Sequence, residues 1–78
     1  MEKELLSSRL KYLEQINQKP GIVGYRVEIS QILKSMIDNG ELTTFMQVEA
    51  VFNHLMEKSS EPIDELEQEA KDIRNFII

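Results

Sequence analysis

The residue best suited to chemistry in this 78-residue sequence is its only histidine, His54. Glu57 follows three positions later, so on a helix the two side chains would share a face, with Glu61 beyond them. A protein metal site needs three or four ligands, and the sequence has no cysteine to complete one. We therefore predict an ordinary, partly exposed histidine, with no metal and no cofactor.

Acidic residues are concentrated near the C-terminus, with five between Glu61 and Glu69 and a sixth at Asp72. On a helix, positions i, i+3 and i+5 point in different directions, so these carboxylates do not converge on one cation. A solvated face is the simpler interpretation, and a docking face for a basic protein partner is the functional one. The candidate docking residues are Asp64, Glu65, Glu67, Glu69 and Asp72.

Catalytic motifs are missing from the sequence. A nucleophile needs a base within reach, and one histidine without cysteine leaves only carboxylate pairs. The sequence contains no HExxH, GxSxG or GxGxxG pattern. The segment Gly21-Ile-Val-Gly24 has the form of an RNA-binding GxxG loop, but it lacks basic residues and is interpreted as a turn. We predict that the protein is not an enzyme and has no catalytic residue.

The charge balance disfavours nucleic-acid binding. Nine Lys and Arg residues against fourteen Asp and Glu residues give a formal charge of −5, and nucleic-acid affinity depends on basic side chains that neutralise phosphates. A helix-turn-helix regulator stays as the alternative function, because a glycine turn joins segments 26–39 and 44–57. In that alternative, Gln47 could reach a base edge, but Glu49 would face the duplex and no Arg or Lys would hold a phosphate.

Hydrophobic periodicity predicts four amphipathic helices. Apolar residues recur at i, i+3, i+4 and i+7 in four segments, near 3–17, 26–39, 44–57 and 62–76. Gly40 suits the left-handed turn after a helix, and Thr44 with Gln47 suits a capping box at the next start. The predicted core is Leu6, Leu10, Leu13, Ile29, Ile32, Leu33, Met36, Phe45, Val48, Phe52, Leu55, Leu66 and Ile73.

The segment 22–29 has two interpretations. Its apolar residues alternate with polar ones and glycine, the period of a strand, but the rest of the chain offers no partner strand. We favour a loop followed by a helix, and a short strand paired with its copy in a second chain is the alternative. Pro20-Gly21 ends the first helix, and we predict a mobile joint there.

The predicted fold is all-α, a small four-helix bundle in a single domain, 1–78. A chain of this size buries little core and commonly needs a disulfide, a metal or oligomerisation, and without cysteine we expect a homodimer. The last helix carries apolar residues at a spacing of 3-4-3-4, typical of a coiled-coil seam. The candidate interface residues are Ile63, Leu66, Ala70, Ile73 and Ile77.

The expected function is general. No signal peptide or membrane segment is evident, and nine isoleucines beside two alanines suggest an AT-rich genome. We expect a small non-catalytic regulator or inhibitor in the bacterial or phage cytoplasm that acts by occupying a protein partner. Met36, Phe45, Met46, Phe52 and Met56 form either its core or an adaptable groove for that partner.

Overall fold

A computed structural model describes residues 2–17 and 26–77 of the chain. These residues form four α-helices and, within the described ranges, no strand. The helices are α1 (Lys3–Asn17), α2 (Val27–Asp38), α3 (Phe45–Glu57) and α4 (Ile63–Ile77). Each predicted helix is confirmed with its ends within one residue. In the described part of the chain, no helix is long and apolar enough to cross a membrane.

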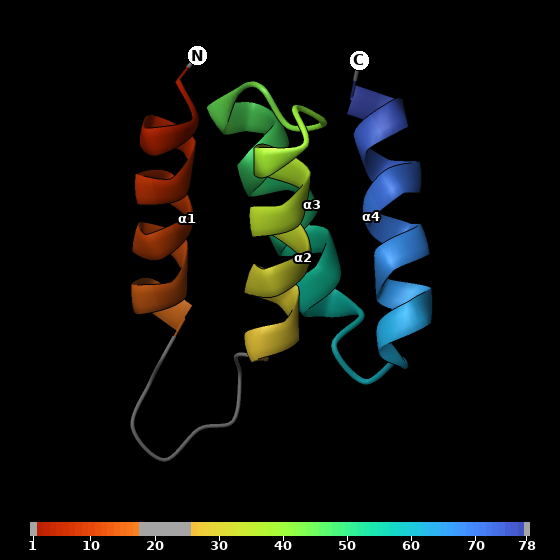
Figure 1. The fold of residues 1–78 in the computed structure, drawn as a ribbon. Helices are drawn as coiled ribbons and strands as arrows, with labels where there is room; N and C mark the ends of the chain where they lie inside the picture. The colour runs from red at the N-terminus through yellow and green to blue at the C-terminus, as the bar shows by residue number, and fades with distance from the viewer. Residues whose placement is uncertain (1, 18–25, 78) are drawn as a thin grey trace.

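The four helices form a bundle in which each helix runs antiparallel to the next (Figure 1). The α2–α3 hairpin lies in the middle, α1 packs on one side of it and α4 packs on the other. Both α1 and α4 contact α2 and α3, but α1 and α4 do not contact each other. The two apolar faces of the hairpin are therefore covered by helices of the same chain.

The hairpin turn follows the prediction for Gly40, which has a φ of 77°. The Gly40 N–H donates to the Ile37 carbonyl at 3.1 Å, and the Glu41 N–H donates to the Met36 carbonyl at 2.8 Å. This pair of bonds is a Schellman motif, which satisfies the last carbonyls of α2. Leu42 then turns inward and is buried, so the turn itself contributes to the core.

The predicted capping box at the start of α3 is confirmed. Thr44 is the N-cap residue, and its hydroxyl accepts a hydrogen bond from the Gln47 N–H at 3.2 Å. The Gln47 side-chain oxygen in turn accepts from the Thr44 N–H at 3.2 Å and from the Thr43 N–H at 2.7 Å. Backbone groups that helix formation leaves without partners are satisfied in this way.

The core matches the predicted list with a few corrections. Phe45 is 36% exposed, because it lies in the first turn of α3, where its ring faces Arg9 instead of the core centre. Ile73 is partly buried and packs against the core. Among the described residues, four further hydrophobic residues are buried although the predicted core omitted them: Ile37, Leu42, Val51 and Ala70. Val51 is buried because three helices surround α3, and Leu42 because the turn folds inward.

Arginine and lysine side chains at helix ends donate hydrogen bonds to backbone carbonyls of neighbouring segments. Lys3 Nζ donates to the Asp38 carbonyl at 2.7 Å, which joins the start of α1 to the end of α2. Arg26 Nη1 donates to the carbonyls of Ser59 and Glu61 at 2.7 and 2.6 Å, and so joins the start of α2 to the α3–α4 connection. Each contact links segments more than thirty residues apart in sequence.

Three expectations for the segment before α2 have different outcomes. The chain is helical from Val27 onward, so a strand that extends to Ile29 is wrong. Arg26 has extended backbone angles as the N-cap residue of that helix. The predicted joint at Pro20-Gly21, the GxxG turn and residues 22–25 lie outside the described residues.

Candidate functional site

The apolar seam of α4 lies inside the bundle. Leu66 and Ala70 are 0% exposed, and Ile73 packs against the same core. Helices α2 and α3 of the same chain cover these residues. Their expected contact with a second chain stays a prediction. Ile63 stays 38% exposed at the start of the helix. The side chain of Ile77 is outside what the structure describes.

The acidic residues of α4 separate into two flanks, because successive helix positions differ by about 100°. Glu67 faces α2, whereas Glu69 faces α3 and meets His54. Asp72 accepts a hydrogen bond from the Gln68 side-chain amide at 3.0 Å. Asp64 and Glu65 are exposed. No group of three potential metal ligands occurs among the described residues.

The actual partner of His54 was not among the predicted ones. His54 Nε2 lies 2.7 Å from Glu69 Oε2, and this contact joins α3 to α4. Glu57 and Glu61, the neighbours that the sequence suggested, make no such contact with the histidine in the described structure. Helix packing decided the pairing, because α3 and α4 lie antiparallel and side by side.

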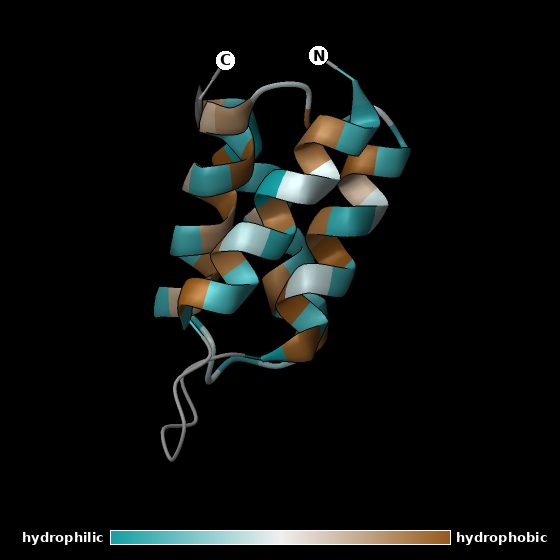
Figure 2. Cartoon of the chain, turned by 90° about the vertical axis from the view of Figure 1, so that its left-hand side faces the viewer, coloured by the Kyte–Doolittle hydropathy of each residue, from teal (hydrophilic) through white to brown (hydrophobic). Residues whose placement is uncertain are grey.

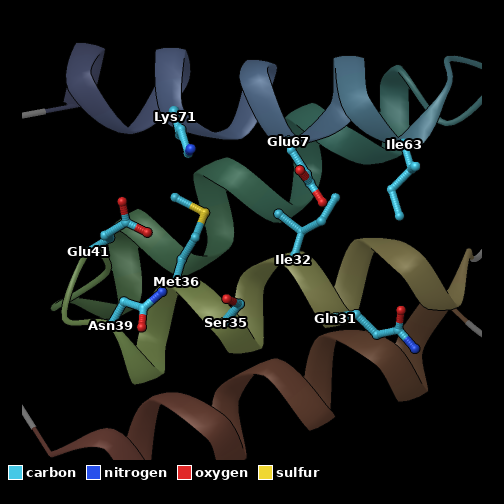
Figure 3. Close-up of a pocket in the computed structure, with 9 residues that line it drawn as sticks. All are labelled: Gln31, Ile32, Ser35, Met36, Asn39, Glu41, Ile63, Glu67 and Lys71. Carbon is cyan, nitrogen blue, oxygen red and sulfur yellow. The ribbon is translucent and has the colours of Figure 1, made fainter.

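A cleft of about 340 Å³ lies between α2 and α4 (Figure 3). Residues from α2, from the turn after it and from α4 line the cleft. They are Gln31, Ile32, Ser35, Met36, Asn39, Glu41, Ile63, Glu67 and Lys71.

The cleft has an apolar end and a charged end. Ile32 points toward α4, and Ile63 descends from α4 beside it (Figure 3). Lys71 and Glu41 lie at the other end, and Glu67 projects between the two ends. The cleft thus offers a place for an apolar group next to carboxylates that can accept hydrogen bonds from a basic group.

A second surface lies along α1, on the side of the bundle away from α4 (Figure 2). Leu5, Tyr12 and Ile16 are each 50% exposed there. The guanidinium of Arg9 lies 5.1 Å from the Tyr12 ring centre and 5.6 Å from that of Phe45. These distances are within the range of cation–π contacts. Arg9 also forms an ion pair with Glu49 of α3.

The sequence carried a signal for this surface. Leu5 and Tyr12 lie at the margins of the apolar stripe of the first helix, which places them beside the core and not in it. Apolar residues at such margins remain exposed unless a neighbouring helix reaches them. Among residues 2–17 and 26–77, no helix covers that side of α1.

The position of α3 bears on the alternative of a DNA-reading helix. Val48, Val51, Phe52 and Leu55 are fully buried, since α1, α2 and α4 all pack against this helix. Near its start, the Gln47 side-chain oxygen accepts capping hydrogen bonds, and Glu49 is paired with Arg9. A reading helix instead presents its first turns to base edges.

Comparison of the chain with protein-family models, with curated proteins and with solved structures finds no match.

Proposed function

We propose that the protein is a small non-catalytic regulator or inhibitor of the bacterial or phage cytoplasm that binds a segment of a protein partner in the α2–α4 cleft. The observation that carries the proposal is the cleft itself, where an apolar end adjoins the carboxylate of Glu67 on α4 and that of Glu41 in the turn after α2. Among the nine lining residues there is no histidine, the usual general base near neutral pH. Their chemistry suits recognition better than turnover.

The cleft favours a partner segment with one apolar anchor next to a lysine or arginine. A volume of about 340 Å³ is enough for a few side chains and too small for a whole helix. The anchor would occupy the end between Ile32 and Ile63, and the basic residue would meet Glu67, since Glu41 shares its end of the cleft with Lys71. The formal charge of −5 would speed the approach of a basic segment.

A peptide-display selection against the immobilised wild-type protein tests the proposal. Short peptides that pair an aliphatic or aromatic residue with Lys or Arg should be enriched, and their binding should weaken as salt concentration rises. Glu67→Lys should abolish binding, because it reverses the charge at the centre of the cleft. Asp64→Lys is the matched control, since it makes the same charge change on an exposed position of α4 and should retain binding.

Two outcomes would refute the proposal. The first is selection of peptides without a basic residue, or of peptides that Glu67→Lys binds as tightly as the wild-type protein does. The second is duplex DNA binding at physiological salt with a dissociation constant below about 10⁻⁶ M, which would favour the nucleic-acid alternative.

A further inference from the structure

Four residues on one side of α1 have a symmetric spacing. Leu5, Arg9, Tyr12 and Ile16 follow one another at intervals of four, three and four residues. At about 100° per residue they form one stripe along the helix, next to the core stripe of Leu6, Leu10 and Leu13. The three apolar members of the outer stripe are half exposed.

This spacing is unchanged when the helix direction is reversed. A second α1 that runs antiparallel to the first would place Leu5 opposite Ile16 of the second copy. It would also place Arg9 opposite Tyr12 of that copy. Two-fold symmetric contacts require a surface that complements itself in this way. The α1 stripe complements itself in this sense. By symmetry the Leu5–Ile16 pair would form twice, and so would the pair of Arg9 with the Tyr12 ring.

The charges of the surface are compatible with such pairing. Lys11, Glu4 and Glu14 lie on other sides of α1, so they would not oppose their own copies. Arg9 is the only charged member of the stripe, and its guanidinium is paired with Glu49 in its own chain. Two copies would therefore bring together two neutralised pairs, and the Arg9 side chain is already ordered between two rings.

We infer that this side of α1 is the contact between two copies of the chain in an antiparallel homodimer. Phe45 of α3 extends the surface beyond α1, since its ring lies 5.6 Å from the Arg9 guanidinium and is 36% exposed. Aromatic residues, methionine and arginine are the types enriched in protein interfaces. A contact made mainly by one helix of each copy should be smaller than the standard interface of about 800 Å² per partner, so we expect a weak dimer.

The arrangement leaves the α2–α4 cleft open in both copies. The cleft lies on the α4 side of the hairpin, and α4 does not contact α1. The dimer would therefore present two clefts that face away from its centre. The inference does not depend on what the cleft binds.

Engineered cysteines provide a direct test, because the chain has none of its own. In an antiparallel dimer, Leu5→Cys protein mixed with Ile16→Cys protein should form a disulfide-linked heterodimer under mild oxidation. Leu5→Cys alone should stay largely unlinked, since two copies of position 5 would lie about 16 Å apart along the helix axis, beyond disulfide reach. Efficient linkage of Leu5→Cys to itself would overturn the antiparallel arrangement.

Sedimentation equilibrium provides the second test. The wild-type protein should pass from monomer to dimer between micromolar and millimolar concentration. Leu5→Glu should weaken association about tenfold or more by burying a carboxylate in the contact. Gln15→Glu is the matched control, because it adds the same charge at an exposed α1 position outside the stripe and should weaken association less.

Circular dichroism should show that both variants remain folded, because positions 5 and 15 are exposed in the single chain. Wild-type protein that stays monomeric at millimolar concentration would overturn the inference. So would a Leu5→Glu variant that associates as strongly as the wild-type protein does.

Discussion

His54 Nε2 and Glu69 Oε2 lie 2.7 Å apart and join α3 to α4 across the surface of the bundle. Their side chains are 26% and 35% exposed, so solvent screens the interaction. A double-mutant cycle with His54→Ala and Glu69→Ala should give a coupling energy of about 0.2–1 kcal/mol in urea unfolding. The matched cycle with Glu57→Ala should give a smaller value. A larger coupling to Glu57 would mean that α3 and α4 are packed differently in solution.

Leu66 and Ile63 test whether the α4 stripe packs inside a single chain. Leu66 is 0% exposed, so Leu66→Ala should lower the free energy of unfolding by about 2–5 kcal/mol. Ile63→Ala removes a similar side chain that is 38% exposed and should cost much less. Urea denaturation measures both. Equal losses would contradict the packing of α4 described above.

Gly40 has a φ of 77°, and a Cβ atom added there would meet no other atom within 4 Å. Any loss of stability in Gly40→Ala therefore arises from the backbone conformation and should be about 1–2 kcal/mol. Gly40→Asn adds a side chain that tolerates the left-handed region better and should cost less. Thermal denaturation distinguishes them, and no loss in Gly40→Ala would exclude the left-handed turn.

Thr44 and Thr43 both contact Gln47, but only the Thr44 hydroxyl accepts a hydrogen bond from a helix N–H group. Thr44→Ala should lower the free energy of unfolding by about 1 kcal/mol. Thr43→Ala keeps the hydrogen bond from its backbone N–H to Gln47, so the loss should be smaller. Urea unfolding of the two variants compares them, and the reverse order would argue against the capping box.

Glu28 provides a pH-dependent prediction. A hydrogen bond from its own backbone lowers the pKa of the Glu28 carboxyl, burial opposes this effect, and the contact with Arg26 lowers the pKa further. A lowered pKa in the folded state stabilises the protein above the unfolded pKa, and this contribution is lost as pH falls through the folded value. Between neutral pH and pH of about 3, the wild-type protein should lose more stability than Glu28→Gln. Urea midpoints measured across that range check this, and parallel curves would refute it.

The helices were predictable because their determinants are local. The spacing of Ile29, Leu33 and Met36 defines a helical face wherever the segment lies, and Gly40 and Thr44 act through bonds to their near neighbours. Helix ends were therefore predicted within one residue. The burial of Leu42 was harder to predict from the sequence, because it depends on how the turn folds back toward the core.

The site residues were harder to predict, because their roles depend on which helices become neighbours. The 3-4 spacing of Leu66 and Ala70 is the same whether the helix packs on its own chain or on another, and the structure places both in the core. His54 likewise has carboxylates nearer in sequence than Glu69. The spacing of Leu5, Arg9, Tyr12 and Ile16 was visible in the sequence, and so was the marginal position of Leu5 and Tyr12. Whether a neighbouring helix reaches these residues depends on the packing of the bundle.

The central position of α3 also affects how the bundle opens. This helix contacts all three others, whereas α1 and α4 do not contact each other. Either outer helix can therefore separate from the hairpin while the other stays packed, so amide hydrogens of α1 and α4 can exchange with solvent through partial openings. We therefore expect the amides of α3 around Phe52 to exchange only when the whole bundle unfolds, so that their exchange rate would report its global stability.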